Sequence, residues 1–208
     1  IDMSRIVITS GPTRQYLDPV RYLTNASSGQ MGKELAEQGL KLGHEIVIVT
    51  GPVSIQYPAP AKIIQVVTTQ EMLDVTREQF SHAEGLIGVA APCDYMPRVI
   101  QPQKIPKTGH NLMLELIETP DIVATLAAEK NENQWVVGFA LETEDRRHRA
   151  IAKMQRKRCN LMVSNSADAI NSAETDLEIL NCDGQLIEHV IGSKRQAAKQ
   201  IWSAITAY

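Results

Sequence analysis

Residues suited to phosphate binding gather near the start of the chain. A run of small and polar residues, Asn25-Ala26-Ser27-Ser28-Gly29, stands directly before an apolar helical pattern. Ser27, with Gln30 three places later, fits a capping box and predicts a helix start near Ser27 or Ser28. A helix start presents unpaired N–H groups and the positive end of the helix dipole, and Gly29 and Gly32 would let a ligand approach the backbone. We therefore predict an anion site here, with phosphate as the expected ligand.

An ordinary capped helix after an ordinary loop is the competing interpretation of this segment. Roughly twenty irregular residues inside a compact domain are usually functional, which favours the anion site. Neither common phosphate-binding motif is present. Gly32-Lys33 is followed by Glu34 rather than by Ser or Thr, and no Gly-x-Gly-x-x-Gly occurs. A nucleotide bound here would need a different kind of loop.

A second group of candidate residues follows a predicted buried strand. The sequence there reads Gly88-Val89-Ala90-Ala91-Pro92-Cys93-Asp94-Tyr95. The small side chains of Ala90 and Ala91 would let a ligand lie against the backbone, with the Asp94 carboxylate at the edge of that surface. A loop aspartate that caps its own turn is the competing interpretation. No base is paired with Cys93 in the sequence, so we do not expect a catalytic thiol.

A basic helix is the third candidate. Seven of the 21 basic residues lie in the segment 146–158. Arg146, Arg149, Lys153 and Lys157 are spaced so that they share one helical face. Such a face would suit a polyphosphate, although a merely solvated helix face has the same pattern.

The composition is that of a soluble globular protein, with 43% hydrophobic and 22% charged residues among 208. We expect one domain spanning residues 1–208. The net charge of −3 offers no basic field for nucleic acid, and no apolar stretch is long enough to cross a membrane. We therefore expect neither kind of partner. Three cysteines without Cys-x-x-Cys spacing indicate a reducing, cytoplasmic setting: Cys93, Cys159 and Cys182.

Strand and helix patterns alternate along the chain. Apolar runs predict strands at 5–10, 45–50, 62–67, 85–89, 112–117, 135–140 and 161–164, and a β-hairpin at 175–181 and 185–191. Periodicity and caps predict helices at 29–42, 68–80 and 145–158, one starting at Thr119-Pro120-Asp121 and one capped by Ser193. This order predicts an α/β fold with a doubly wound, mostly parallel Rossmann-like sheet flanked by helices, in which the C-terminal hairpin adds an antiparallel strand.

Four prolines break the pattern between residues 90 and 107. Pro92, Pro97, Pro102 and Pro106 exclude a continuous helix or a central strand there. The resulting long loop comes directly after a strand. In open α/β sheets ligands bind at the carboxyl ends of the strands, so this loop is expected to border the site.

Several sequence blocks, in order, resemble phosphopantothenoylcysteine synthetase, a ligase of coenzyme A biosynthesis. The opening signature is Gly11-Pro12-Thr13-Arg14, Leu17-Asp18-Pro19-Val20-Arg21-Tyr22 and Asn25-x-Ser27-Ser28-Gly29-x-Met31-Gly32. Later blocks are Ala90-Ala91 with Asp94-Tyr95, Lys104-Ile105 with Lys107, Pro120-Asp121-Ile122-Val123, Gly138-Phe139-Ala140, and Lys153 with Lys157. The blocks extend from Gly11 to Lys157, so the resemblance covers most of the chain.

The resemblance implies a two-step reaction. The carboxylate of 4′-phosphopantothenate attacks the α-phosphate of CTP to give an acyl-cytidylate and pyrophosphate, and the amine of L-cysteine then displaces CMP. The blocks look bacterial, so CTP is expected rather than ATP, with Mg²⁺ accompanying the nucleotide. Many bacterial relatives fuse this domain to a flavin-dependent decarboxylase. The sequence contains no such domain, so no flavin is expected.

The resemblance also assigns residues. Asn25 and Lys104 would be catalytic, Lys104 in a mobile flap of about residues 92–110, where Pro106 departs from the family pattern. The substrate would contact Arg21, Asn25, Ala90, Ala91 and Asp94, and Arg21 would reach the neighbouring subunit's site in a homodimer. The nucleotide would contact Gly11, Ser27, Gly29, Gly32, Gly88, Val89, Ala90, Asp94, Lys104, Pro120, Asp121, Ile122, Val123, Phe139, Lys153 and Lys157.

Two other classes of function stay open. A nicotinamide-dependent oxidoreductase would use a similar sheet, but the glycine fingerprint and any Tyr-x-x-x-Lys are absent. A non-catalytic nucleotide-binding module would also suit the basic helix. Nucleotide binding without turnover would identify the module, and binding of a nicotinamide cofactor would identify the oxidoreductase.

Overall fold

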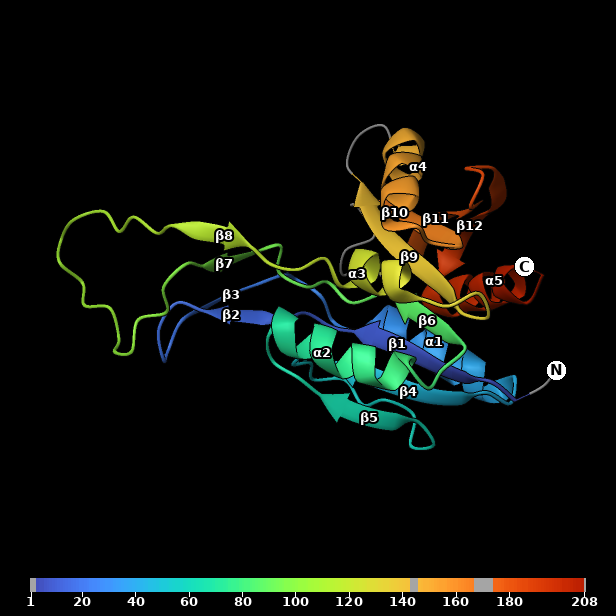
Figure 1. Cartoon of the computed structure of the whole chain (residues 1–208), viewed down its shortest axis with the longest axis horizontal. Helices are drawn as coiled ribbons and strands as arrows, with labels where there is room; N and C mark the ends of the chain where they lie inside the picture. Colours follow the sequence, from blue (N-terminus) through green and yellow to red (C-terminus); the bar gives the residue numbers. More distant parts are fainter. Residues whose placement is uncertain (1–2, 143–145, 167–173, 208) are drawn as a thin grey trace.

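An eight-stranded sheet forms the body of the molecule (Figure 1), as described by a computed structural model for residues 3–142, 146–166 and 174–207. The strand order is β12-β11-β10-β9-β6-β1-β4-β5. The central strands pair in parallel. They are β5 (Lys62–Gln65), β4 (Glu45–Thr50), β1 (Arg5–Ser10), β6 (Gly85–Gly88), β9 (Trp135–Glu142) and β10 (Leu161–Ser166).

The C-terminal strands complete the sheet at one edge. β11 (Glu174–Asn181) runs antiparallel to both β10 and β12 (Leu186–Ser193). The predicted doubly wound, mostly parallel sheet with an antiparallel strand from the hairpin is therefore confirmed. Four predicted strand ends were wrong by two residues, because β5 already ends at Gln65, whereas β9 continues to Glu142, β10 to Ser166 and β12 to Ser193.

Helices cover both faces of the sheet. α1 (Gln30–Lys41) and α5 (Lys194–Ala207) pack on the face that receives Ile6 and Ile8 of β1. α2 (Thr69–Phe80), α3 (Ile122–Glu129) and α4 (Arg146–Lys157) pack on the face that receives Val7. Because β1 is covered on both sides, its sequence reads as a continuous apolar run rather than an alternating one.

Two of the predicted helix caps are confirmed. The Thr68 hydroxyl accepts from the Glu71 N–H at 3.1 Å, and the Glu71 carboxylate accepts from the Thr68 N–H at 3.1 Å. Ser193 caps α5 in the same reciprocal way, with Gln196 as its partner. These caps fix where α2 and α5 begin.

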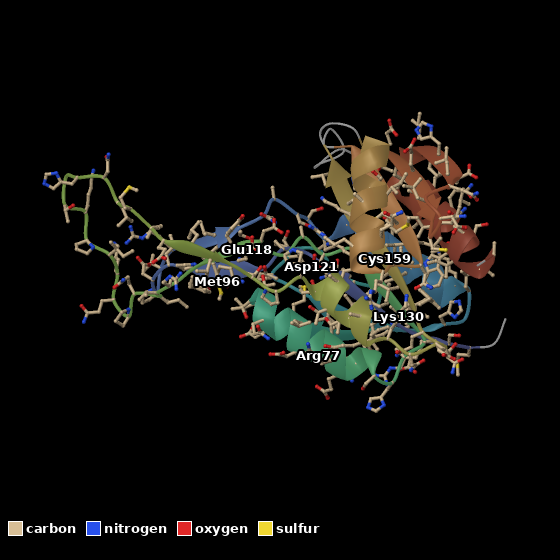
Figure 2. The ribbon with its side chains drawn as sticks, turned by 45° about the horizontal axis from the view of Figure 1, so that its top comes forward. Arg77, Met96, Glu118, Asp121, Lys130 and Cys159 are labelled. Atoms are coloured by element: carbon tan, nitrogen blue, oxygen red, sulfur yellow. The ribbon has the colours of Figure 1, made fainter. Side chains whose placement is uncertain are left out.

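A thin extension projects from the carboxyl ends of β1 and β6 (Figure 1). Two antiparallel ribbons form it: β2 (Arg14–Tyr16) with β3 (Tyr22–Thr24), and β7 (Tyr95–Pro97) with β8 (Leu116–Glu118). Met96 and Glu118 lie where the second ribbon joins the body (Figure 2). We refer to residues 14–24 and 95–118 as the arm.

The arm corrects two predictions. The segment 11–29 is not wholly irregular, and the strand predicted at 112–117 lies at Leu116–Glu118 instead. Each ribbon strand has three residues, too few to produce a readable alternation, and Pro97 is tolerated because β7 belongs to a two-stranded ribbon rather than the central sheet.

Candidate functional site

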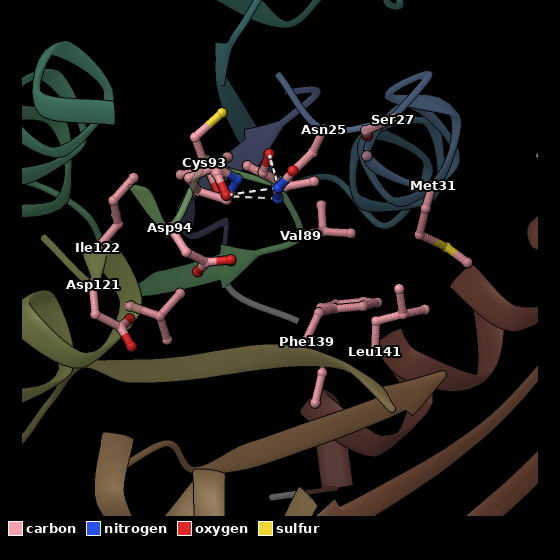
Figure 3. Close-up of a pocket in the computed structure, with 18 of the residues that line it drawn as sticks. Asn25, Ser27, Met31, Val89, Cys93, Asp94, Asp121, Ile122, Phe139 and Leu141 are labelled. Carbon is pink, nitrogen blue, oxygen red and sulfur yellow. Dashed lines mark hydrogen bonds between the residues drawn. The ribbon is translucent and has the colours of Figure 1, made fainter. Parts of the chain in front are cut away.

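A cleft of about 1150 Å³ opens at the carboxyl ends of β1, β6 and β9. It lies between β1 and β6, where the strand order reverses and where ligands bind in doubly wound sheets. Figure 3 shows its walls. The predicted site residues that line it are Asn25, Ser27, Gly29, Gly32, Gly88, Val89, Ala90, Ala91, Asp94, Pro120, Asp121, Ile122, Val123, Phe139, Lys153 and Lys157.

The start of α1 forms one wall, but its geometry differs from the prediction. Gly29 occupies the N-cap with a φ of 77°, and no side chain caps the helix. The predicted capping box between Ser27 and Gln30 was therefore wrong. The Gln30 side chain instead donates to Glu34 at 2.8 Å. The Gln30 N–H donates to the Ser28 hydroxyl at a long 3.4 Å, and the next N–H groups of the helix have no capping side chain, which suits an anion even better than the predicted cap.

Two glycines are required at this wall for different reasons. Gly29 adopts the left-handed conformation that side-chain-bearing residues rarely take. A Cβ on Gly32 would collide with the Ser10 hydroxyl, because α1 starts directly against the end of β1. Both substitutions would move the backbone that lines the cleft.

Asn25 joins the α1 side of the cleft to the segment after β6. Its Nδ2 donates to the Pro92 carbonyl at 2.9 Å and to the Ala91 carbonyl at 3.4 Å (Figure 3). Asp94, from the same segment, is exposed to the cleft. The structure thus brings together two groups of predicted residues that lie more than sixty positions apart in the chain.

Cys93 belongs to the same segment, but its side chain is buried. Its Sγ donates to the carbonyls of Thr13 and Leu23 at 3.5 Å, and its N–H donates to the Thr13 hydroxyl at 2.9 Å. Burial raises the pKa of the thiol, an effect only partly offset by the Thr13 hydrogen bond. These contacts support the expectation that Cys93 is not a nucleophile. Its carbonyl accepts from the Thr119 hydroxyl at 2.5 Å, so this residue joins the segment after β6 to the segment between β8 and α3.

The opposite wall consists of the start of α3 and the end of α4. Asp121 is the N-cap of α3, with Oδ1 accepting from the Ala124 N–H at 3.0 Å, so the predicted cap at Thr119 was wrong. Its Oδ2 lies 3.0 Å from Nζ of Lys157, whose side chain is only 18% exposed. Lys153 lines the same wall. The side chains of Arg146 and Arg149, the other members of the predicted basic face, lie outside the described residues.

Sequence reasoning missed several residues of the cleft. Arg156 and Lys194 add positive charge, and burial lowers the pKa of Lys194. Lys194 starts α5 after β12, a strand parallel to β10, so its place at the carboxyl edge follows from the strand directions. A weaker indication in the sequence that Arg156 lines the cleft is that it directly precedes Lys157. The remaining missed residues are Thr9, Ala26, Ser28, Gln30, Met31, Pro92, Cys93, Tyr95, Glu118, Thr119, Ala124, Ala140, Leu141 and Asn165.

Three predicted site residues do not line the cleft. Gly11 lies behind it, where its carbonyl accepts from the Ala91 N–H at 2.9 Å. Arg21 and Lys104 lie on the arm. Arg21 pairs with Asp18 and donates to the Ile105 carbonyl at 2.6 Å.

Comparison with known families settles the relationship of this chain to other proteins. The sequence profile of the DNA/pantothenate metabolism flavoprotein C-terminal domain matches residues 1–208. The chain belongs to this family. The chain spans about half the length of the curated relatives it matches.

Two of these relatives and one solved structure show the extent of the likeness. The coenzyme A biosynthesis bifunctional protein CoaBC of Vibrio parahaemolyticus is 37% identical over 187 residues, which cover 87% of this chain and 47% of that protein. The CoaBC protein of Escherichia coli K12 is 38% identical over 189 residues, covering 88% and 47%. The crystal structure of a CoaBC C-terminal domain matches with a TM-score of 0.83 at 33% identity, over 97% of this chain and 93% of that one.

Two further properties concern the described residues alone. No group of three or more His, Cys, Asp or Glu side chains among them is arranged to hold a metal ion. Within the same part of the chain, every helix is too short or too polar to span a membrane.

Proposed function

We propose that this domain is a phosphopantothenate–cysteine ligase of coenzyme A biosynthesis. The observation that carries the proposal is the single shared cleft. Asn25 and the Ala90-Ala91 backbone border the same cavity as the start of α1 and the basic end of α4. Its volume of about 1150 Å³ exceeds that of a typical single-ligand pocket, roughly 300–1,000 Å³. The family membership supports the same reaction.

The first step is attack of the 4′-phosphopantothenate carboxylate on the α-phosphate of a nucleoside triphosphate. An oxygen–phosphorus bond forms and pyrophosphate leaves. The nucleophile is already ionised, so the step needs alignment of two anions and neutralisation of their charge rather than a general base. Lys153, Arg156, Lys157 and Lys194 supply positive charge around the cleft. The start of α1 supplies N–H groups.

We assign the acyl group to the other side of the cleft. Asn25, Ala90, Ala91 and Asp94 would surround the acyl carbon of the intermediate. In the second step the amine of cysteine attacks that carbon and an amide bond forms. The bond from the acyl carbon to the phosphate oxygen breaks, the nucleoside monophosphate leaves with the bonding electrons, and the nitrogen releases one proton to solvent. The fixed position of the Asn25 amide supports a role in orienting this group.

We assign the nucleotide to the wall that joins α3, β9 and α4, near Phe139 and the residues Pro120 to Val123. CTP is the proposed nucleotide, on the basis of the sequence blocks. Mg²⁺ typically binds through one or two carboxylates together with substrate phosphates, and the cleft offers Asp94 and Glu118. When bound, the ion would neutralise phosphate charge. Gly88 and Val89 would border the nucleotide, and Gly11 would act only by shaping the loop.

We also propose a homodimer formed through the arm. The arm exposes apolar side chains that a monomer would leave in water, notably Val99, Ile100, Leu112 and Met113 at 55–88% exposure. A second copy of the chain would cover them. Arg21 and Lys104 lie on this arm, which supports their placement near a neighbouring subunit's cleft rather than deep inside their own.

The proposed function is tested by pyrophosphate release. Purified protein is incubated with 4′-phosphopantothenate, Mg²⁺ and either CTP or ATP, with and without L-cysteine. We expect release that requires phosphopantothenate, a single turnover without cysteine and many turnovers with it. Comparison of CTP with ATP names the nucleotide. Folded protein that binds CTP without releasing pyrophosphate would instead support a non-catalytic nucleotide-binding module.

A further inference from the structure

A buried carboxylate in the arm has no part in the reaction proposed above. Asp18 is fully inaccessible to solvent although the arm around it is thin and exposed. Burial alone would raise the pKa of this carboxyl. Hydrogen bonds from the backbone of Val20, Ile105 and Arg21 and from the Arg21 side chain outweigh that effect and hold the pKa well below its ordinary range. Asp18 is therefore held as the carboxylate anion.

The two oxygens of Asp18 do different things. Oδ1 accepts from the N–H groups of Val20 at 2.9 Å and Arg21 at 2.8 Å, and so closes the local turn between β2 and β3. Oδ2 accepts from Arg21 Nε at 2.9 Å and from the Ile105 N–H at 3.1 Å, a residue 87 positions away. One oxygen thus shapes the turn and the other holds a distant segment.

Arg21 completes the attachment from the other side. Its Nη2 donates to the Ile105 carbonyl at 2.6 Å and lies 2.6 Å from Oδ2 of Asp18. Both backbone groups of Ile105 are therefore bound by this ion pair. We refer to Asp18, Arg21 and the backbone of Ile105 as the clamp.

The clamp is the firmest attachment of a long exposed segment. Every residue from 98 to 116 is exposed except Ile105, which is half-buried. Two other backbone hydrogen bonds hold the segment, from Gln101 to the Leu17 carbonyl at 2.9 Å and from Arg98 to the Glu115 carbonyl at 2.9 Å. Lys104 is the neighbour of Ile105 in the chain. Its backbone position consequently depends on the clamp more than on any packing of its own side chain.

We propose that Asp18 is a positioning residue of the ligase, which acts by fixing Ile105 and thereby the place from which Lys104 reaches the reacting phosphates. This inference rests on the proposed function, since it assumes that Lys104 takes part in that reaction. It gives the buried ion pair a purpose beyond stability. A flexible segment that carries a reacting lysine loses less conformational freedom at each turnover if its backbone is already anchored.

The chain offers a substitution that separates the two oxygens. In Asp18→Asn the side-chain oxygen can still accept from the backbone N–H groups of Val20 and Arg21. The amide nitrogen that replaces Oδ2 cannot accept a hydrogen bond from the Ile105 N–H or from the Arg21 side chain. The local turn is kept and the clamp is lost. Glu115→Gln is the matched control, because it breaks the exposed Arg98–Glu115 ion pair of the same arm without touching the clamp.

The test is a double-mutant cycle on pyrophosphate release with Asp18→Asn, Lys104→Ala and the double variant. We expect Asp18→Asn to lower kcat by roughly tenfold to a hundredfold, as misplacement of a reacting group does, with little change in KM for the nucleotide. In the Lys104→Ala background it should have no further effect. Glu115→Gln should match the wild type. Multiplicative losses from Asp18→Asn and Lys104→Ala would overturn the proposal and leave Asp18 a purely structural residue.

A second readout does not depend on activity. Hydrogen exchange of the Ile105 amide should accelerate in Asp18→Asn by more than the exchange of the buried sheet amides, because loss of the ion pair lowers the stability of the whole fold as well, while the sedimentation of the protein stays unchanged. Unchanged exchange at Ile105 would overturn the clamp itself. Absence of pyrophosphate release from the wild type would instead sink the proposed function, so the two failures are told apart.

Discussion

The ammonium of Lys157 lies 3.0 Å from Oδ2 of Asp121, which ties the last turn of α4 to the first turn of α3 at the edge of the cleft. The other carboxylate oxygen, Oδ1, caps α3 by accepting from the Ala124 N–H. One side chain therefore sets the start of one helix and orients a cation that ends another. This arrangement allows the cap and the charge to be tested separately.

Asp121→Ala should lower stability, whereas Asp121→Asn should not. Asn caps helices about as well as Asp, but Ala loses roughly 1 kcal/mol. The ion pair is partly exposed on its Asp121 side and contributes little. For a domain of this size about 1 kcal/mol corresponds to a fall in melting temperature of about 2–4 °C. Thermal denaturation of both variants checks this. Equal losses in the two would mean that the ion pair, not the cap, stabilises α3.

Lys157→Met should weaken nucleotide binding while leaving the fold intact. A charge-assisted hydrogen bond to phosphate contributes about 1.5–3 kcal/mol, so we expect KM for the nucleotide to rise roughly tenfold to a hundredfold. Lys199→Met is the control, because Lys199 is exposed on α5 and does not line the cleft. A KM unchanged by Lys157→Met would remove Lys157 from the nucleotide site.

The mostly parallel, doubly wound sheet could be predicted from the sequence because its buried central strands are continuous apolar runs that alternate with recognisable helices, although the order of the strands was not predicted. The start of α1 could not be placed to the residue. Ser27 and Gln30 satisfy the spacing of a capping box, but the chain turns at Gly29 instead, where a positive φ costs nothing. Several consecutive small residues could each end the loop and start the helix, and tertiary packing determines which of them does.

The arm shows the same limit on a larger scale. Its four strands have three residues each, too few for an alternating pattern to be recognised in the sequence. The hydrogen bond between Asp18 and Ile105 could not be predicted from the sequence either, because the two residues lie 87 positions apart. Contacts of that range follow from the sheet order, which brings the loops after β1 and β6 together. The cleft residues taken from the family blocks line the cavity because they follow those same two strands or face them from α3, β9 and α4.

Asn25→Asp should impair turnover without unfolding the protein. The amide donates to the carbonyls of Ala91 and Pro92, and a carboxylate in its place would have no hydrogen to donate and would face two carbonyl oxygens. The side chain is exposed, so the fold does not depend on it. We expect kcat to fall by at least about tenfold with an unchanged melting temperature. Turnover at the wild-type rate would remove Asn25 from the mechanism.

Substitution on the arm should abolish the proposed dimer. Ile100 is 60% exposed and Met113 is 88% exposed, so neither supports the fold of a single chain. Ile100→Asp with Met113→Asp would place two charges in the buried centre of an interface. We expect the wild type to sediment at twice the mass of one chain and this variant at the mass of one. Lys199→Met again serves as the control. A wild type that sediments as a single chain at micromolar concentration would contradict the proposed dimer.

The three thiols should differ in reactivity. Cys182 is exposed in the turn between β11 and β12, whereas Cys93 and Cys159 are buried. Burial raises the pKa of Cys159 to about 11, and only the thiolate reacts readily. We expect one thiol to react promptly with a disulfide reagent at pH 8 in the folded protein, and all three after denaturation. In Cys182→Ser no thiol should react before unfolding. Prompt reaction of a second thiol would contradict the burial of Cys93 and Cys159.

The raised pKa of Cys159 also predicts a dependence of stability on pH. The unfolded thiol ionises above pH 9, while the folded thiol keeps its proton until about pH 11. The folded state therefore binds more protons between these values, and stability falls as pH rises through them. We expect this group to contribute a loss of about 1 kcal/mol between pH 8 and pH 10. Urea denaturation of the wild type and of Cys159→Ala at both pH values isolates the effect. Equal losses in the two proteins would assign it to other groups.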